Sequence, residues 1–432
     1  MKIYQNPDRN QWAEILARPT SDAARIEADV ARILEQVKAE GDAALRALTK
    51  KFDGADLTRF DVSDEELAAA ETLISDELKQ AIQTAWRNIH AFHAAQRPDA
   101  IHKIETMPGV WCWRKNVPVE RVGLYVPGGS APLFSTVLML ATPARIAGCR
   151  EVILATPPDA DGRIHPAILY AARLTGVTKI FKMGGAQAIA ALAFGTASVP
   201  AVHKIFGPGN QYVTTAKMLV NKTGIPIDMP AGPSEVLVVA DAFADPDFVA
   251  ADLLAQAEHG PDSQVVLVAC SAEKVSEILH AVEVQCTRLP RADIARRALE
   301  NSVAIVVESP EKALEISNFY APEHLIIATR NADQLAEKVE NAGSVFIGDF
   351  SPESVGDYAS GTNHTLPTNG AARAYSGVSL DSFVKKITFQ KLTESGLRNI
   401  GPTVEIMAAA EALDAHRIAV SIRLEKLRKP EL

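Results

Sequence analysis

Short apolar runs alternate with longer amphipathic segments over the middle and later parts of this 432-residue chain. Buried strands of a parallel sheet read as continuous apolar runs, and helical crossovers separate one strand from the next. The runs fall into two sets, so we predict two α/β sheets. The first set comprises residues 122–126, 151–155, 179–183 and 204–206, and the second comprises residues 235–240, 264–269, 303–307, 325–329 and 345–348.

Helical periodicity dominates the segment before the first strand, from about residue 21 to residue 97. Ser63 and Glu66 have the spacing of a capping box, and Ser75 is expected to begin a longer helix. One face of that helix carries apolar residues together with His93. We therefore interpret His93 as a residue packed within a helix and not as a metal ligand.

The expected fold class is α/β, with two doubly wound sheets and helical extensions at both ends of the chain. The first sheet lies within about residues 125–233 and is expected to be inserted as a unit into the segment that forms the second. The pattern after Ser382 is charged and mostly helical. This extension needs another surface to pack on, and a second subunit is one candidate.

Composition narrows the class of protein. A chain of 432 residues is expected to form two or more domains, and its 47% hydrophobic and 22% charged residues are ordinary for a globular protein. The net charge of −9 argues against a nucleic-acid partner, which would need a basic face. No apolar run reaches membrane-spanning length, and the first residues do not have the pattern of a signal peptide. We therefore expect a cytoplasmic protein without a membrane partner.

The four cysteines are expected to be reduced. They form no C-x-x-C pair, and a chain of this size does not need disulfides for stability. The residues concerned are Cys112, Cys149, Cys270 and Cys286.

Gln256 and His259 are the first candidates for metal chemistry. Asp245 and Pro246 have the residue types of a helix start, and Gly260 follows the expected end of the same helix. Residues three apart share one helix face, so an amide oxygen and an imidazole would lie side by side. These groups are half of a mixed nitrogen and oxygen metal site. A polar helix end in solvent is the alternative.

Three further segments place titratable residues beside expected strands or in loops of small residues. Glu323 and His324 precede an apolar run, and Asp357 and His364 lie in a loop region rich in glycine. His416 lies in the last helical stretch. Titratable groups gathered beside buried strands are typical of functional sites.

Three glycine-containing turns each follow an expected strand of the first sheet and open a helix. They are residues 127–130, 184–187 and 207–210. Glycine lets the backbone approach a ligand closely, and helix N-termini favour phosphate, so the turns indicate a nucleotide crevice. None has the pattern G-x-G-x-x-G, and plain βα turns are the alternative.

Six segments of the chain resemble those of the histidinol dehydrogenase family. The resemblance extends over nearly the whole chain, with the segments in the family's order and spacing. The segments are YVPGG at 125–129, GPGN at 207–210, AGPSE at 231–235, QAEHG at 256–260, APEH at 321–324 and GTNHTLP at 361–367.

This resemblance implies an enzyme that oxidises L-histidinol to L-histidinal and then to L-histidine, with reduction of two NAD. That reaction is the last step of histidine biosynthesis. The resemblance also implies one Zn²⁺ per subunit, held by Gln256, His259, Asp357 and His416. It further implies an intertwined homodimer with shared active sites, in which His416 reaches the site of the other chain.

The resemblance assigns roles to individual residues. Glu323 and His324 match the family's catalytic acid–base pair. The positions that match substrate-binding residues are Ser234, Gln256, His259, His324, Asp357, Glu411 and His416. The positions that match NAD-binding residues are Tyr125, Gln187 and Asn210.

Four segments follow as expected domains. Residues 1–24 form an N-terminal extension, and residues 25–124 with 235–378 form the main α/β domain, which carries the metal and acid–base residues. Residues 125–234 form an inserted Rossmann-like NAD-binding domain. Residues 379–432 form a C-terminal helical extension that is exchanged between subunits.

The residue types also suggest how the chemistry runs. A neutral His324 can take the alcohol proton, and Glu323 can activate the water that aldehyde oxidation requires. A covalent cysteine route is disfavoured because neither Cys112 nor Cys149 has a candidate base beside it in sequence. His364 is expected to bond backbone rather than to act directly.

Three alternatives remain open at this level. The nearest is a related zinc-dependent polyol dehydrogenase that acts on another alcohol. The second is a zinc hydrolase with Glu323 as its base, although hydrolysis does not need the nucleotide turns. The third is a non-catalytic metal-binding or nucleotide-binding module, which the intact acid–base pair disfavours.

Overall fold

The chain forms two units in the computed structural model, which describes residues 1–19, 23–97, 101–128, 131–230 and 232–428. The first unit comprises Met1–Ala95 and Val119–Phe383, and the second comprises Gln96–Pro118 and Val384–Leu432. Parts of three predictions lie outside the described residues. They are the helix start near Ser21, Gly129 and Ser130 of the first glycine turn, and Ala231 of the AGPSE segment.

The larger sheet of the first unit has six strands, and every pair is parallel. Its order is β1-β10-β9-β8-β11-β12, so the five strands that follow residue 234 run in the 3-2-1-4-5 order of doubly wound sheets. The strands are β1 (Lys2–Gln5), β8 (Glu235–Ala240), β9 (Gln264–Ala269), β10 (Val303–Val306), β11 (His324–Ala328) and β12 (Ser344–Ile347).

Helices cover both faces of this sheet, and β8 and β9 are buried along their whole length. One face packs against α10 (Pro246–Ala257), α11 (Ala272–Cys286) and α12 (Ala292–Glu300). The other face packs against α1 (Trp12–Ile15), α13 (Pro310–Tyr320) and α14 (Ala332–Ala336). The predicted start of α10 is confirmed, because the Asp245 side chain caps it and Pro246 is its first residue.

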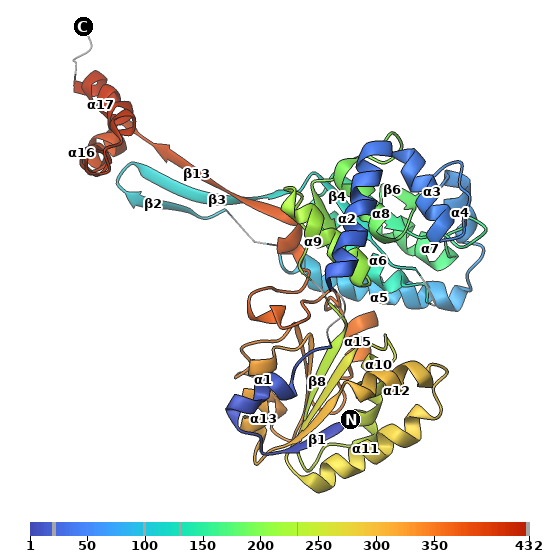
Figure 1. Cartoon of the computed structure of the whole chain (residues 1–432). Helices are drawn as coiled ribbons and strands as arrows, with labels where there is room; N and C mark the ends of the chain where they lie inside the picture. Colours follow the sequence, from blue (N-terminus) through green and yellow to red (C-terminus); the bar gives the residue numbers. More distant parts are fainter. Residues whose placement is uncertain (20–22, 98–100, 129–130, 231, 429–432) are drawn as a thin grey trace. The chain divides into compact units, whose positions relative to one another are not determined.

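The smaller sheet has four parallel strands in the order β6-β5-β4-β7. They are β4 (Arg121–Tyr125), β5 (Glu151–Thr156), β6 (Lys179–Lys182) and β7 (Lys204–Phe206). One apolar core includes α5 (Asp76–Ala94), α6 (Phe134–Ala147) and α7 (Pro166–Thr175), and the other includes α2 (Ala23–Glu40), α3 (Asp42–Phe52), α8 (Gly185–Phe194) and α9 (Gln211–Lys222). Figure 1 shows these helices around the sheet, and α4 (Asp64–Ala70) packs on α7.

Two expected groupings differ from this packing. Residues 25–95 were assigned to the larger sheet, but Val30 and Leu45 pack in the core with α8, and Ile89 packs in the core with α6. Residues 1–24 were expected as an extension, but β1 pairs with β10 at the edge of the larger sheet. Helical periodicity shows which face of a helix is buried and does not show which sheet buries it.

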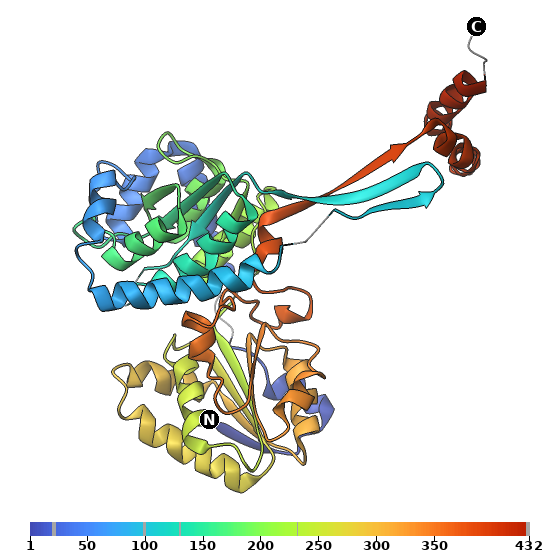
Figure 2. The same cartoon turned by 180° about the vertical axis from the view of Figure 1, so that it is seen from behind.

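The second unit is a three-stranded antiparallel sheet followed by two helices (Figure 2). Its strands are β2 (Lys103–Met107), β3 (Val110–Pro118) and β13 (Val384–Leu392), and its helices are α16 (Glu394–Ala410) and α17 (Asp414–Arg428). The prediction of mostly helical structure after Ser382 is confirmed for these helices and wrong for β13. Seven of the nine β13 residues are exposed in this chain, so the strand lacks the apolar alternation that identifies a half-buried strand.

A loop region with a few short helices connects β12 to β13. It contains α15 (Glu353–Tyr358) and the short 3₁₀ helices at Ala371–Arg373 and Leu380–Phe383, and a further 3₁₀ helix at Arg9–Gln11 precedes α1. Among the described residues, no helix is both long enough and apolar enough to cross a membrane.

Candidate active site and nucleotide crevice

The predicted acid–base pair lies at the amino edge of the larger sheet. His324 is the first residue of β11 and pairs with Val236 of β8, so the start of each strand faces the other. Gln256 lies in the last turn of α10, whose C-terminal end reaches the same edge. α15 brings Asp357 to the imidazole of His324. Segments far apart in sequence therefore meet here.

His324 lies at the centre of this cluster and is almost fully buried. Its Nδ1 is 3.2 Å from the backbone oxygen of Glu235 and 3.6 Å from Oε2 of Glu323. Its Nε2 is 3.5 Å from Oδ1 of Asp357 and has no hydrogen-bond partner among the described residues. The contact of Nδ1 with the backbone thus orients the ring, while Nε2 faces the carboxylate of Asp357.

Electrostatics in the cluster raise the pKa of both the acid and the base. Burial by itself would lower the pKa of His324, but the carboxylates of Glu353, Glu323 and Asp357 outweigh it and raise that pKa well above its usual value. Burial raises the pKa of Glu323 to about 8. The Glu323 carboxylate also accepts a hydrogen bond from the Glu235 backbone N–H at 2.9 Å.

Three side chains present metal-binding atoms to a common point. The ligand atoms of His259, Glu353 and Asp357 all lie within 4.8 Å of one another. His259 and Asp357 belong to the predicted ligand set, so the structure brings these two together. Desolvation in these crowded surroundings lowers the pKa of His259, although part of the ring is exposed, and so favours the neutral ligand form.

Glu353 is a donor that the sequence analysis missed. Glu353 and Asp357 are four residues apart on α15, so both face the same side of that helix. This spacing was the available signal, but the segment was interpreted as a loop. Burial, followed by repulsion from Asp357, raises the pKa of Glu353 to about 8.

The fourth nearby donor is the buried side-chain amide of Gln256. In the orientation that satisfies hydrogen bonding, its nitrogen donates to Oε1 and Oε2 of Glu353 at 2.5 and 3.2 Å, and its oxygen faces the Glu235 backbone N–H at 3.3 Å. The opposite orientation sets the amide oxygen against the Glu353 carboxylate, which is repulsive unless a cation lies between them. With the amide oxygen turned toward Glu353, as a bound cation would require, the amide, the imidazole and the two carboxylates form a donor set that suits a divalent metal.

His364 has both ring nitrogens engaged. Nδ1 lies 2.8 Å from the backbone oxygen of Asp357, and Nε2 lies 3.1 Å from the hydroxyl of Thr136 on α6. Burial lowers the pKa of His364. The contact with the Asp357 backbone oxygen agrees with the expectation that His364 bonds backbone.

The remaining substrate-binding candidates are found at different places in the chain. Ser234 immediately precedes β8, and its backbone oxygen accepts a hydrogen bond from the Gln264 N–H at 3.2 Å. Glu411 caps the C-terminal end of α16, and His416 lies in the first turn of α17. Glu411 and His416 are both exposed and belong to the second unit, so their assignments remain predictions.

A separate cavity of about 1550 Å³ lies at the carboxyl ends of the smaller sheet. Its lining includes the three predicted cofactor-binding residues, Tyr125, Gln187 and Asn210. Tyr125 ends β4, whereas Gln187 lies in the first turn of α8 and Asn210 is the N-cap of α9. The order of the sheet reverses between β4 and β7, where doubly wound sheets bind their ligands.

Polar groups are arranged around this cavity with one of them unpaired. The Tyr125 hydroxyl accepts a hydrogen bond from the Gly185 N–H at 3.1 Å, and burial raises the pKa of Tyr125 to about 12. The Asn210 side chain accepts from the backbone N–H groups of Tyr212 and Val213. Nε2 of Gln187 is buried without a hydrogen-bond partner among the described residues, as expected for a group that awaits a ligand.

A nucleotide-type crevice on one doubly wound sheet and an acid–base cluster with metal donors on another define an α/β enzyme of the oxidoreductase class. Comparison with known proteins identifies the family. The family model described as histidinol dehydrogenase matches residues 16–424, and the chain belongs to the histidinol dehydrogenase family.

Individual relatives match over nearly their full length. The chain is 59% identical to the histidinol dehydrogenase of Bacteroides thetaiotaomicron over 99% of this chain and 100% of that protein. It is 56% identical to that of Xylella fastidiosa over 98% of this chain and 99% of that protein. The crystal structure of histidinol dehydrogenase from Elizabethkingia anophelis superimposes with a TM-score of 0.96 at 56% identity, with 99% of each chain covered.

Proposed function

We propose that this protein oxidises L-histidinol to L-histidine through L-histidinal, with NAD as hydride acceptor and Zn²⁺ at the active site. This reaction is the last step of histidine biosynthesis, and the cytoplasm is its expected location. The observation that carries the proposal is the meeting of Glu323 and His324 with His259 and Asp357 at one sheet edge. The matched relatives are named for this activity.

The donor set supports a zinc site formed by Gln256, His259, Asp357 and His416. Bound zinc would orient the nitrogen donors of the substrate and offset the carboxylate charge beside His324. Glu353 contacts Gln256 and shares the face of Asp357, so it would fix the orientation of the ligating amide.

Three proton transfers follow from the positions of the acid and the base. His324 in its neutral form accepts the hydroxyl proton of the alcohol, and the carbon releases a hydride to NAD. Water then adds to the aldehyde as Glu323 accepts one of its protons. After His324 has released its first proton to solvent, it takes a proton from the resulting hydrate as a second hydride leaves to a second NAD, and the carboxylic acid forms. Ser234 is adjacent to β8, at the edge where these groups lie.

The crevice on the smaller sheet supports NAD binding by Tyr125, Gln187 and Asn210. Gln187 offers an unpaired buried amide nitrogen, and Tyr125 a hydroxyl fixed by the backbone of Gly185. NAD supplies the hydride acceptor for both oxidations.

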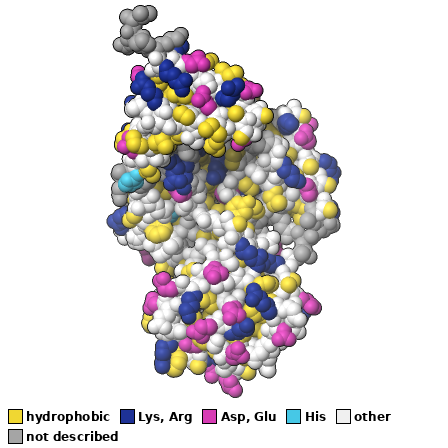
Figure 3. All heavy atoms as spheres, turned by 90° about the vertical axis from the view of Figure 1, so that its left-hand side faces the viewer, with side chains coloured by type: hydrophobic (Ala, Val, Ile, Leu, Met, Phe, Trp, Pro, Cys, Tyr) yellow, Lys and Arg dark blue, Asp and Glu magenta, His cyan; other side chains and the backbone are white. Residues whose placement is uncertain are grey.

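An intertwined homodimer, in which His416 and Glu411 complete the site of the other chain, is part of the proposal. Apolar side chains of the second unit are exposed in the single chain, which supports a partner surface. They include Ile406 at 71%, Met407 at 60%, Ile422 at 49% and Ile418 at 46% exposed. Figure 3 shows hydrophobic side chains among the charged ones on these helices.

The direct test is the appearance of NADH from purified protein supplied with L-histidinol, L-histidinal or simple diols. Two NADH per L-histidinol and one per L-histidinal are expected. A higher kcat/KM for a diol than for L-histidinol would contradict this proposal and would indicate a polyol dehydrogenase. The zinc hydrolase receives no support from the family match.

Metal removal tests the zinc assignment separately. Extensive chelation is expected to abolish activity and leave the circular dichroism spectrum of the sheets unchanged, because their apolar cores do not involve the site. Zn²⁺ should restore activity. Full activity of a sample shown to be free of metal would contradict the assignment.

A further inference from the structure

The nucleotide crevice contains a carboxylate that none of the assignments above uses. Asp53 follows the last residue of α3 and lines the same cavity as Tyr125 and Gln187. Its Oδ2 is buried and has no hydrogen-bond partner among the described residues. A buried acceptor without a donor destabilises the fold, so the burial of this oxygen indicates a role in binding a ligand.

Asp53 lies against the turn that opens α8. Its Oδ1 is 3.2 Å from the point that a Cβ on Gly184 would occupy, and Gly184 is the N-cap of that helix. The next residue, Gly185, donates its N–H to the Tyr125 hydroxyl. The carboxylate is therefore part of the same wall of the crevice as a predicted cofactor contact.

Three cationic side chains also line the cavity: Lys51 lies over the Phe52 ring at 5.1 Å, and the two arginines are ion-paired. Arg32 pairs with Asp29, and Arg163 pairs with Asp161. Burial raises the pKa of Asp53 to about 6, and no hydrogen bond or cation contributes to that shift. The group is still mainly ionised at neutral pH, as a negative charge with free acceptor positions.

A carboxylate in this state recognises vicinal hydroxyl groups. Its two oxygens accept hydrogen bonds from a diol, and a phosphate at the same place would be repelled. In doubly wound dinucleotide sites an acidic residue commonly accepts from the adenosine ribose 2′-hydroxyl, the position that carries the phosphate in NADP.

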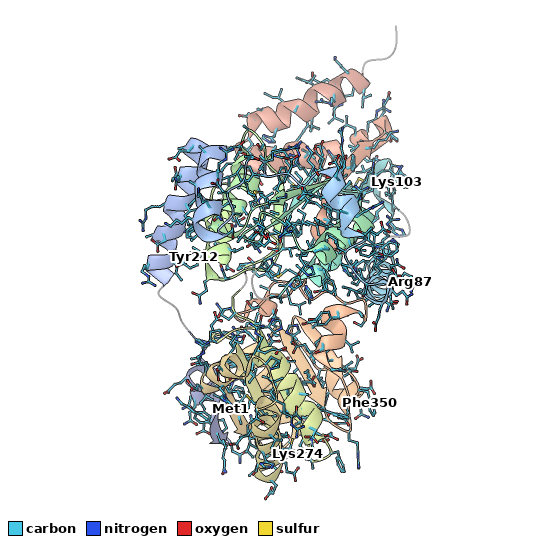
Figure 4. The ribbon with its side chains drawn as sticks, turned by 90° about the vertical axis from the view of Figure 1, so that its right-hand side faces the viewer. Met1, Arg87, Lys103, Tyr212, Lys274 and Phe350 are labelled. Carbon is cyan, nitrogen blue, oxygen red and sulfur yellow. The ribbon has the colours of Figure 1, made fainter. Side chains whose placement is uncertain are left out.

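We infer that Asp53 accepts hydrogen bonds from the adenosine ribose hydroxyls of the dinucleotide and thereby selects NAD over NADP. The inference rests on the proposed function, because it takes this crevice as the NAD site. Asp53 would be a specificity residue that stays apart from the chemistry. Tyr212, labelled in Figure 4, lines the same crevice from the start of α9.

The test measures binding of NAD⁺ and NADP⁺ by isothermal titration calorimetry to the full-length protein and its variants. Asp53→Asn and Asp53→Ala are expected to weaken NAD⁺ binding by about tenfold, the value of one hydrogen bond to a charged group. NADP⁺ binding should stay unchanged or improve, so the ratio of the dissociation constant for NADP⁺ to that for NAD⁺ should fall at least tenfold.

Asp56→Asn is the matched control. Asp56 is three residues further along, is exposed, and pairs with Lys50 at 2.6 Å. The Asp56→Asn substitution makes the same change in net charge outside the crevice. The ratio of the two dissociation constants should therefore stay within twofold of the ratio for the unchanged protein. A fall as large as that of Asp53→Asn would overturn the inference, because net charge alone would then explain it.

Thermal unfolding gives a second readout. Without nucleotide, Asp53→Asn should raise Tm above pH 6, because it removes a partly buried carboxylate without a partner. The rise in Tm caused by NAD⁺ should become smaller. An unchanged NAD⁺-dependent rise together with an unchanged affinity ratio would overturn the inference.

Failure of the inference is separable from failure of the proposed function. If the unchanged protein binds no NAD⁺, or if Asn210→Ala leaves NAD⁺ affinity intact, the crevice assignment fails and the inference fails with it. If Asn210→Ala weakens NAD⁺ binding and Asp53→Asn leaves the affinity ratio unchanged, only the role of Asp53 is wrong.

Discussion

At the residue scale, the chemistry depends on one imidazole among several carboxylates. Glu323 is adjacent to His324 in the chain, whereas Asp357 and Glu353 come from α15. Each acid has a different surrounding, so the three are not interchangeable. Glu323 alone among them accepts a backbone N–H from the neighbouring strand, which fixes its carboxylate relative to β8.

The acid and the base should separate the two oxidations. His324→Asn is expected to slow both steps by about 10²–10⁴, because each requires a base at the oxygen of the reacting carbon. Glu323→Gln should spare alcohol oxidation and slow aldehyde oxidation, since only that step needs activated water. Single-turnover NADH formation from L-histidinol and from L-histidinal measures each step. Equal slowing of both steps by Glu323→Gln would exclude a separate role in water activation.

Asp252 on α10 should make stability depend on pH. Burial raises the pKa of this carboxyl to about 7, above its value of 3.8 in the unfolded chain. The folded state then binds the proton more tightly, so the contribution to stability is present below pH 4 and is lost as pH rises to about 7. Asp252→Asn should therefore stabilise the protein at pH 8 by about 1 kcal/mol, after allowance for partial solvent screening.

Urea unfolding at pH 5 and pH 8 measures this effect. The gain from Asp252→Asn should be larger at pH 8 than at pH 5. Asp247→Asn on the same helix is the control, because it makes the same change in net charge at an exposed position in the first turn of α10 and should give no stabilisation at pH 8. If Asp252→Asn raised the free energy of unfolding by the same amount at pH 5 and pH 8, the raised pKa of the Asp252 carboxyl would be contradicted.

At the scale of elements, the turn after β7 packs closely against the end of β4. Gly207 has φ +128°, and a Cβ there would lie 2.0 Å from the backbone oxygen of Tyr125. The Gly207 N–H is also bound by the side chain of Asp228 at 2.8 Å. Close approach of β7 to β4 therefore requires glycine, and the end of β4 carries a predicted cofactor contact.

Gly207→Ala should destabilise the protein by at least about 3 kcal/mol, because both the backbone angle and the contact with Tyr125 are unfavourable. Gly224→Ala is a matched control, since Gly224 also has positive φ (+96°) but no heavy atom within 4 Å of an added Cβ. It should cost only the backbone strain, about 1–2 kcal/mol. Thermal and urea unfolding compare the two, and equal losses would show that the contact with Tyr125 relaxes freely.

At the scale of the whole molecule, the proposed active site requires two chains. His259 and Asp357 lie in the first unit and His416 in the second. In the single chain, the second unit buries few side chains of α16 and α17 and leaves several apolar ones exposed. A dimer that buries these side chains and completes the site would account for both features.

Complementation tests the shared site. A His416→Ala chain and a His259→Ala chain are each expected to be inactive. In a mixed dimer one site would contain both lesions and the other neither, so activity should return to about half the normal sites per mixed dimer. Subunit exchange is verified with two affinity tags. Exchange without recovered activity would mean that both histidines act within one chain.

Sequence alone was sufficient for the features that depend on local pattern. The apolar runs identified both parallel sheets, since buried strands must be continuously apolar. The prediction that one helix face carries both Gln256 and His259 was wrong for His259, because α10 ends at Ala257 and a turn connects the two residues. The glycine turns located the crevice that Tyr125, Gln187 and Asn210 line.

Tertiary structure decided the features that depend on what a surface packs against. The pattern of α2–α5 showed an apolar face, but only the fold showed that the smaller sheet buries it. β13 has no alternation because most of its side chains are exposed, so only its pairing with β3 reveals a strand. Glu353 and Asp53 are ordinary acids in sequence. Their raised pKa values come from burial by segments distant in the chain, and local composition does not encode that burial.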